Sequence, residues 1–377
     1  MPHGIRRRDI TTERFAEVYA RHRRDSPNSA VVATAKELGI NTSAVVSRIK
    51  TLERAHVFPH PSGHAVQGVS TLYDTDGNIS VQWVKSRAAE RTPEQWAEHV
   101  RDALADVNPI GVFKCPNQVN KDLLTVYPVG DHHVAMYAWS EEVGNDYDIK
   151  IADKLLTSAV THLVDVSPQS ETALIINVGD FFHVDNIRNE TSRSSNTLDV
   201  DTRYAAMIRA GVKMLRQIIE TALAKHRFVK VVSAIGNHDD IGAQWLSLAL
   251  ALYYEKNKRV VIETKPGKFH YHQHGKSLIG ITHGDTGRPE KLQGVMAADV
   301  PALWGATTHR HWFTGHVHNK SIVEFPGVTW ETVRTLAPAD AWAHAAGYRA
   351  GRDMQAVVFH VEHGEIARHR FNVSMLR

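Results

Sequence analysis

Hydrophobic residues repeat at helical spacing in three short segments near the N-terminus. The first stripe contains Phe15, Val18 and Tyr19. Two later stripes share the spacing i, i+1, i+4 and i+7: Val31, Val32, Ala35 and Leu38, then Val45, Val46, Ile49 and Leu52. Gly39 separates these two stripes, and Asn41 or Thr42 can cap the helix that follows. Two amphipathic helices joined by a glycine-containing turn are typical of a helix-turn-helix.

The charge of the same segment favours nucleic-acid binding. Residues 1–55 contain 11 Lys and Arg against 6 Asp and Glu, whereas the rest of the chain contains 33 against 35. The outward face of the last predicted helix offers donors for phosphates and groove edges: Ser43, Ser47, Arg48 and Lys50, with Arg54 just beyond. We therefore predict a DNA-binding helix-turn-helix domain in residues 1–60. A small helical dimerisation or docking module is the alternative.

Residues 61–120 are predicted to form a β-hairpin and a helix that connect the two ends of the chain. Alternating strand formers flank Asp76-Gly77, a strong hairpin signal. Thr92, Pro93 and Gln95 mark the start of the helix as cap, first position and capping-box partner. The hairpin is either a wing of the DNA-binding unit or a separate small sheet.

Short apolar runs alternate with helical segments from about residue 121. Five of these runs lie at 123–129, 173–178, 229–235, 277–281 and 311–314. This alternation predicts an α/β layered domain over residues 121–377. In such domains the loops that follow the carboxyl ends of strands carry the chemistry.

A polar cluster follows each of the five runs. In order they are Gly130-Asp131-His132-His133, Gly179-Asp180-Phe181-Phe182-His183, Gly236-Asn237-His238-Asp239, Thr282-His283-Gly284-Asp285 and Gly315-His316-Val317-His318. With 24 histidines and the single cysteine Cys115, the chain has no internal disulfide framework and no Cys-only zinc site. Imidazole and oxygen donors suit Mn, Fe, Zn or Mg rather than Cu(I). One such cluster is weak evidence, but five in series predict a metal site.

The order of the clusters resembles the calcineurin-like metallophosphoesterase family. The motifs of that family are Asp-x-His, Gly-Asp, Gly-Asn-His-Asp/Glu, His and Gly-His-x-His, and each has a counterpart here. The resemblance covers residues 123–377. It implies an α/β fold in which a two-sheet β sandwich is flanked by helices and holds two metal ions at the sheet edges.

The resemblance also implies a role for each matching residue. One ion would be held by Asp131, His133 and His318, and the other by Asn237, His283 and His316, with Asp180 bridging both. His238 would be the acid–base or phosphate-stabilising residue, and Asp239 would orient it. The cofactors would be two divalent ions, Mn first and Fe, Zn or Mg as alternatives, sharing a hydroxide that attacks a phosphodiester in line.

The second cluster distinguishes between branches of this family. Protein phosphatases have Gly-Asp-x-x-Asp-Arg-Gly, whereas His183 followed by Val184-Asp185 stands here. Gly-Asp-x-Phe-His looks like the double-strand-break repair exonuclease branch, which implies a catalytic role for His183; holding Asp180 is the alternative. Residues 137–139, 146–148 and 179–186 are similar to phage-encoded members of that branch.

The resemblance and the basic N-terminus together predict a metal-dependent DNA nuclease, exonuclease-like, with DNA as its substrate. One alternative is a small-nucleotide phosphodiesterase or phosphatase with a regulatory N-terminal module, and another is a non-catalytic DNA-binding regulator. A homodimer is compatible with all three. No capping domain and no docking helix for an ATPase is recognisable, which argues against an ATPase partner.

The pattern leaves several roles near the site open. His132 is expected to point away from it, toward a supporting or surface position, and Asp285 either orients His283 or is a plain loop carboxylate. Segments 321–325, 328–333, 355–361 and 366–373 alternate and predict a closing sheet. The loop between segments 328–333 and 355–361 either lines a nucleic-acid groove or packs in the ordinary way. It contains Trp342, His344, Tyr348, Arg349 and Arg352.

The cellular compartment is predicted from the absence of targeting signals. The first ten residues are basic but no apolar segment follows them, and the most apolar stretch, 246–254, is too short to span a bilayer. We therefore expect a cytoplasmic protein without membrane association, in the host cytoplasm for a phage-encoded member.

Overall fold

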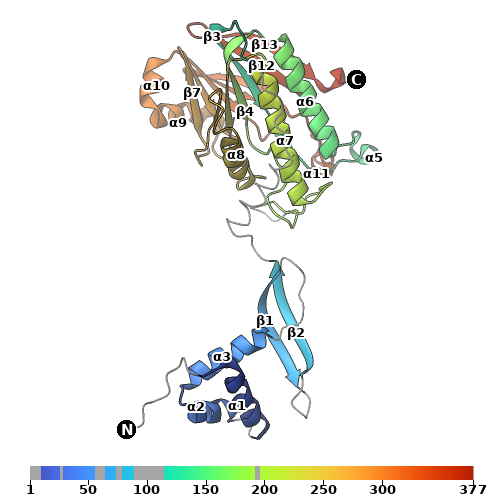
Figure 1. The fold of residues 1–377 in the computed structure, drawn as a ribbon. Helices are drawn as coiled ribbons and strands as arrows, with labels where there is room; N and C mark the ends of the chain where they lie inside the picture. The colour runs from blue at the N-terminus through green and yellow to red at the C-terminus, as the bar shows by residue number, and fades with distance from the viewer. Residues whose placement is uncertain are drawn as a thin grey trace. The chain divides into compact units, whose positions relative to one another are not determined.

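The computed structural model describes residues 10–25, 29–55, 64–73, 79–88, 114–191 and 196–376. The chain divides into two compact units, Met1–Glu98 and His99–Arg377. They are coloured blue and green to red, respectively, in Figure 1. No helix in the described ranges is long and apolar enough to cross a bilayer.

Three helices pack together in the first unit: α1 (Thr12–Asp25), α2 (Ala30–Leu38) and α3 (Thr42–Ala55). Their shared core includes Phe15, Val18, Leu38 and Val45. α2 ends at Gly39, whose φ of 64° suits a residue without a Cβ. Asn41 caps α3, because its Oδ1 accepts a hydrogen bond from the Ala44 amide at 2.8 Å. Helices lie at the three predicted positions, while the assignment as a helix-turn-helix and the DNA-binding role stay predictions.

Two residues of the predicted apolar stripes lie outside this core. Val32 and Val46 are 62% and 41% exposed. Successive residues on a helix point about 100° apart, so the i+1 position leaves the buried side. The remaining stripe positions that the structure describes are buried or half-buried.

Arg48 does not lie on the outward face of α3 as predicted. Its guanidinium lies 5.6 Å from the centroid of the Phe15 ring and donates a hydrogen bond to the Ile10 carbonyl at 2.9 Å. Arg48 therefore braces the helical core, whereas Ser43 and Ser47 are exposed on α3. The side chains predicted to bind DNA at positions 50 and 54 lie outside the described part of the chain.

Two long strands complete the described part of this unit. β1 (His64–Tyr73) and β2 (Ile79–Ala88) pair antiparallel, with Leu72 opposite Val81. The predicted strands are confirmed. The turn at Asp76-Gly77 and the helix predicted from Thr92 lie outside the described residues.

The second unit contains two mixed sheets. The larger has the order β13-β12-β3-β4-β5-β6 and consists of β3 (Asn120–Val129), β4 (Ser170–Asn177), β5 (Phe228–Ser233), β6 (Val260–Ile262), β12 (Asp353–His360) and β13 (Gly364–Asn372). The smaller has the order β10-β11-β9-β8-β7 and consists of β7 (His270–His274), β8 (Ser277–Ile281), β9 (His309–Thr314), β10 (Ser321–Phe325) and β11 (Val328–Thr332). β3 to β6 are parallel, as are β8, β9 and β11, so their carboxyl ends share an edge.

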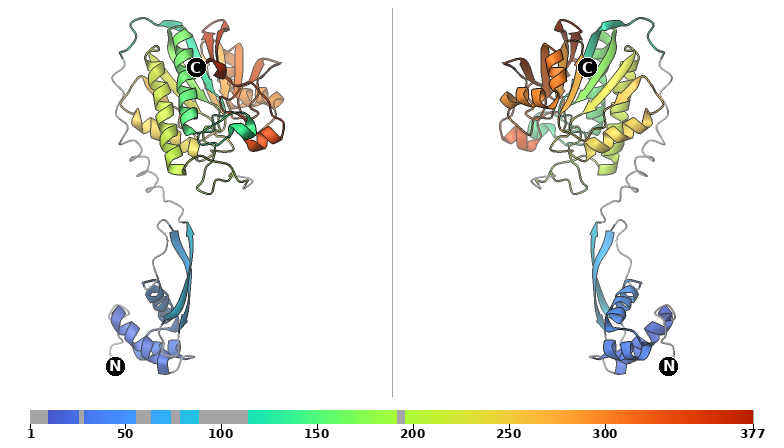
Figure 2. Two further views of the ribbon diagram at one scale, coloured as in Figure 1. Left: turned by 90° about the vertical axis from the view of Figure 1, so that its right-hand side faces the viewer. Right: turned by 90° about the vertical axis from the view of Figure 1, so that its left-hand side faces the viewer.

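The two sheets stack, and helices cover their outer faces (Figure 2). The inner faces meet in an apolar core that includes Leu124, Ile176, Ile279, Phe313 and Phe359. The larger sheet is covered by α6 (Ile149–Val166), α7 (Tyr204–Leu223) and α8 (Gly242–Tyr253). Over the smaller sheet lie η1 (Pro289–Lys291), α9 (Leu292–Asp299) and α10 (Pro301–Ala306). The short helices α5 (Ser140–Val143) and α11 (Ala341–Ala345) lie in connections, and η2 (Val373–Met375) follows β13. The predicted sandwich with flanking helices is confirmed.

The C-terminal strands do not form one closing sheet, as the alternation had suggested. β10 and β11 extend the smaller sheet beyond β9, whereas β12 and β13 form an edge of the larger one. Alternation shows which face of a strand is buried but does not identify its partner strand. β6 and β7 were not predicted, because β6 is three residues long and β7 consists mainly of polar residues.

Candidate metal centre

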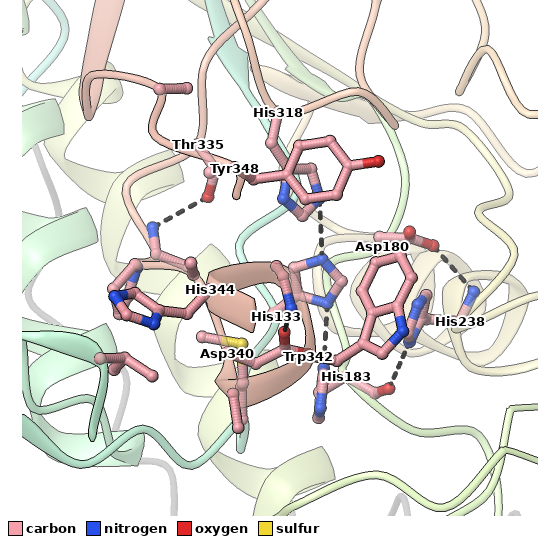
Figure 3. Close-up of a pocket in the computed structure, with 18 of the residues that line it drawn as sticks. His133, Asp180, His183, His238, His318, Thr335, Asp340, Trp342, His344 and Tyr348 are labelled. Atoms are coloured by element: carbon pink, nitrogen blue, oxygen red, sulfur yellow. Dashed lines mark hydrogen bonds between the residues drawn. The ribbon is translucent and has the colours of Figure 1, made fainter. Parts of the chain in front are cut away.

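The five polar clusters converge at one edge of the sandwich. Three of them follow β3, β4 and β5 in the larger sheet, and two follow β8 and β9 in the smaller sheet. Parallel strands bring their carboxyl ends to the same edge, so loops far apart in the sequence meet there. Figure 3 shows His133, Asp180, His183, His238 and His318 around one cavity.

One group of predicted ligands consists of Asp131, His133 and His318, whose donor atoms lie within 4.8 Å of one another. The Nε2 atoms of His133 and His318 are 3.2 Å apart, and Asp131 Oδ1 is 3.6 Å from His318 Nε2. Asp131 is fully buried, yet its Oδ2 has no hydrogen-bond partner among the described atoms. A buried carboxylate oxygen without a donor is costly unless a cation compensates it. The group therefore fits a divalent metal ion.

A second group consists of Asp180, His283 and His316. His283 Nε2 lies 3.1 Å from Asp180 Oδ2 and 3.0 Å from the Asn237 side-chain oxygen. Burial alone would lower the pKa of His283, but the carboxylates of Asp180 and Asp131 raise it to about 10. The negative charge of the carboxylates therefore stabilises a positive charge at this position, and a bound metal ion would supply one. The bridging role of Asp180 stays a prediction.

Five of the seven predicted ligands have backbone in the left-handed region. Their φ values are positive although none is glycine: Asp131 (23°), His133 (48°), Asp180 (50°), His316 (68°) and His318 (54°). Each such residue costs on the order of 1–3 kcal/mol, and such strain persists where the surrounding structure fixes it. The strained ligands lie in the three loops that follow β3, β4 and β9.

Glycines in the motifs make room for ligands from neighbouring loops. A Cβ on Gly236 would lie 2.0 Å from Asp180 Oδ1, and one on Gly179 would lie 2.6 Å from His283 Nδ1. Gly179 also has a φ of 101°. The glycine in each of these motifs is therefore a consequence of close packing between the loops.

His183 and His238 lie beside the first group. Their rings are stacked with centroids 5.4 Å apart, and His183 Nδ1 is 3.2 Å from His133 Nδ1. Burial lowers the pKa of His183 to about 3, so its ring is neutral. His238 Nδ1 donates a hydrogen bond to the His183 carbonyl at 2.8 Å. In a neutral ring this leaves Nε2 as the acceptor nitrogen.

Asp239 does not contact the His238 ring in the way that the sequence suggested. Its carboxylate accepts hydrogen bonds from four backbone amides, those of Gly236, Asp180, Phe181 and Phe182, at 2.8 to 3.2 Å. Burial and the charge of Asp180 raise the pKa of Asp239 to about 8, while the amide of Phe182 opposes the shift. Asp239 therefore ties the second loop to the third.

His132 and Asp285 have supporting positions. His132 is fully buried, points away from the ligands and bonds to the Ala152 carbonyl at 3.1 Å. Burial lowers its pKa to about 4. Asp285 accepts from Lys268 Nζ at 2.8 and 3.1 Å, while His283 Nδ1 donates to the Val178 carbonyl at 2.9 Å. That carbonyl, rather than Asp285, orients His283.

Five of the seven predicted ligands line a cavity of about 1200 Å³: His133, Asp180, Asn237, His316 and His318. The aromatic and basic loop forms another part of its wall, contributing Trp342, His344, Tyr348, Arg349 and Arg352. Sequence reasoning missed Thr335, whose hydroxyl donates to the Asp131 carbonyl at 2.7 Å, and the polar segment 196–199, which also lines the cavity. No motif marks either of them. Their positions depend on contacts between residues far apart in the chain.

Comparison with known proteins adds weak likenesses. No family model and no curated protein matches the chain. One similar solved structure is a predicted phosphoesterase from Streptococcus pneumoniae, 10% identical over 67% of this chain and 99% of that one, with a TM-score of 0.28. Vacuolar protein sorting 29 from Cryptosporidium parvum is 14% identical over 67% and 100%, with a TM-score of 0.31. A 5'-nucleotidase from Candida albicans is 10% identical over 69% and 54%, with a TM-score of 0.32.

Proposed function

We propose that this chain is a dimetal phosphodiesterase of the metallophosphoesterase type and that its substrate is DNA. One observation carries the proposal. Donors from four loops line one cavity, the fifth loop places His283 beside Asp180, and five of the seven predicted ligands have a strained backbone. Such convergence of imidazole and carboxylate groups suits divalent metals, with Mn as the first candidate and Fe, Zn or Mg as alternatives.

The donors divide into two sites and a flanking pair. Asp131, His133 and His318 would hold one ion, and Asn237, His283 and His316 the other, with Asp180 shared. When bound, two such ions neutralise phosphate oxygens and lower the pKa of an attacking water. Because its Nδ1 is held by the His183 carbonyl, His238 would present Nε2 to the substrate; once Nε2 carries a proton, it would donate a hydrogen bond to the phosphate or pass that proton to the leaving oxygen.

Two features support a polynucleotide over a small nucleotide. The cavity of about 1200 Å³ exceeds the roughly 300–1,000 Å³ of pockets that enclose small ligands. The first 55 residues carry an excess of Lys and Arg, which favours attraction of a phosphate backbone. We propose that the first unit binds DNA and that Ser43 and Ser47 contact it. Arg48 would support the helical core through Ile10 and Phe15 rather than contact the DNA. Cleavage from a strand end, as in exonucleases, is part of this proposal.

A matrix of metals and substrates tests the proposed function. Mn, Mg, Zn and Fe are each combined with linear, circular and single-stranded DNA, RNA and cyclic nucleotides, with His238→Ala as the control. We expect metal-dependent cleavage of DNA that the variant loses. Cleavage of no DNA form with any metal would overturn the proposal, and faster turnover of cyclic nucleotides would favour a small-nucleotide phosphodiesterase.

A further inference from the structure

Two aromatic side chains form an exposed surface on the wall of the metal cavity. Trp342 is 72% exposed and Tyr348 is 55% exposed. Their rings lie 6.0 Å apart between centroids and are inclined by 33°. Large aromatic residues bury most of their area in protein cores. Ordinary packing therefore does not explain why both rings face the cavity.

Hydrogen bonds to main-chain amides fix the segment that carries this pair. Asp340 caps α11, because its Oδ1 accepts from the Ala343 amide at 2.7 Å, and the Tyr348 amide donates to the Ala343 carbonyl at 3.0 Å. Gly347 has a φ of 85°, which returns the chain after α11 so that Tyr348 lies beside Trp342. The rings are thus arranged before any ligand binds.

The aromatic pair shares its cavity with the proposed catalytic groups. Both rings line the same space as His183, His238 and His318, and Figure 3 shows these side chains together. Arg349 and Arg352 line the same wall. Arg352 is fixed by hydrogen bonds to the Leu336 carbonyl at 2.9 Å and to Asn145 Oδ1 at 3.1 Å. An aromatic surface flanked by arginine is the arrangement that binds a base and its phosphates.

We infer that Trp342 and Tyr348 form a stacking platform for an unpaired DNA base next to the phosphodiester that is cleaved. This inference rests on the proposed function and specifies its substrate. A base that lies on the platform has left the stack and the pairing of a duplex. The site therefore accepts single-stranded ends and must fray a duplex end before it cleaves.

A pair of oligonucleotides tests the platform directly. One is a single-stranded DNA of ordinary sequence, and the other has abasic positions in its last three nucleotides. Wild type cleaves the ordinary strand faster, and in Trp342→Ala the ratio of the two rates falls by about tenfold. Trp342→Phe keeps an aromatic face and restores most of the ratio. Trp139→Ala is the matched control, because Trp139 is also exposed but is not among the residues that line the cavity.

Duplex ends give a second readout. Wild type should attack a duplex that ends in mismatches faster than one that ends in G·C pairs, because the mismatched end frays more easily. Tyr348→Ala and Trp342→Ala should reduce the rates on both ends, and the single-stranded rate should fall with them. Equal rates on mismatched and G·C ends in wild type would overturn the inference.

Binding separates this inference from the proposed function. The two oligonucleotides are titrated against His238→Ala and against His238→Ala with Trp342→Ala, by fluorescence anisotropy. A base-dependent loss of affinity in the double variant supports the platform even when wild type cleaves no DNA. Cleavage by wild type together with an unchanged ratio in Trp342→Ala would reject the platform and leave the nuclease intact. Equal loss of ordinary RNA and DNA binding would overturn the restriction to DNA.

Discussion

The Nδ1 atom of His238 donates a hydrogen bond to the main-chain carbonyl of His183, 2.8 Å away. A carbonyl can only accept, so this contact fixes the proton of a neutral His238 on Nδ1 and leaves Nε2 unprotonated. The same contact joins the second and third loops. His238 is therefore positioned by backbone, and its side chain can change without removing a predicted metal ligand.

His238→Ala should slow turnover strongly while metal binding survives. General acid–base groups contribute about 10²- to 10⁴-fold to a rate, and we expect a loss of that size in kcat on linear DNA. Metal content, measured by mass spectrometry after dialysis, should equal that of wild type. His162→Ala, on α6, is the control and should keep full activity. Loss of metal from His238→Ala would instead assign His238 to the ligands.

Asp131→Asn should weaken metal binding more than it weakens the fold. The change replaces a buried carboxylate whose Oδ2 has no hydrogen-bond partner among the described atoms, so the variant loses one negative charge at the first group. We expect Mn affinity by calorimetry to fall at least about tenfold. Asp122→Asn, an exposed carboxylate on β3, is the control. Equal affinities in the two variants would show that Asp131 holds no ion.

Gly236→Ala should disrupt the site because the added methyl group forces two neighbouring loops apart. The added Cβ would lie 2.0 Å from Asp180 Oδ1 and 2.3 Å from its amide nitrogen, so one of the two loops must move. We expect lost metal binding and a destabilisation of about 1–3 kcal/mol in urea unfolding. Gly294→Ala in α9 meets nothing within 4 Å and should stabilise the helix by roughly 0.5–1 kcal/mol. A Gly236→Ala protein with normal metal content would contradict the packing argument.

The sequence predicted the strands and loops of the site because both depend on local patterns. Apolar runs gave β3, β4, β5, β8 and β9, and parallel strands bring their loops to one edge. Contacts between residues far apart in the chain could not be predicted from local patterns. The four amides bound by Asp239 come from two loops, and Arg48 reaches Ile10 across the helical core. Neither contact leaves a pattern in the residues next to it.

A buried ionic group between the sheets is a further long-range contact that local patterns did not predict. Glu331 on β11 is fully buried. It accepts from Gln355 on β12 at 2.5 Å and from Arg368 on β13 at 2.6 and 2.8 Å, and pairs with His311 on β9 at 3.0 Å. Burial would raise the pKa of Glu331, but His311 and Arg368 lower it to about 2. The charged carboxylate therefore links both sheets of the sandwich.

The depressed pKa of Glu331 predicts how stability depends on pH. An acid whose pKa is lower in the folded state stabilises the fold above its unfolded pKa, here 4.5, and this contribution is lost as the pH falls toward 2. The difference corresponds to about 3 kcal/mol. Glu331→Gln should therefore lower the free energy of unfolding by about that amount at pH 7. In urea titrations at pH 3 the gap between the two proteins should shrink to about half, because wild type has then lost part of the contribution. Glu324→Gln, an exposed acid on β10, should match wild type at both values. A gap that is the same at pH 7 and pH 3 would mean that Glu331 stabilises the sandwich by shape and hydrogen bonding rather than by its charge.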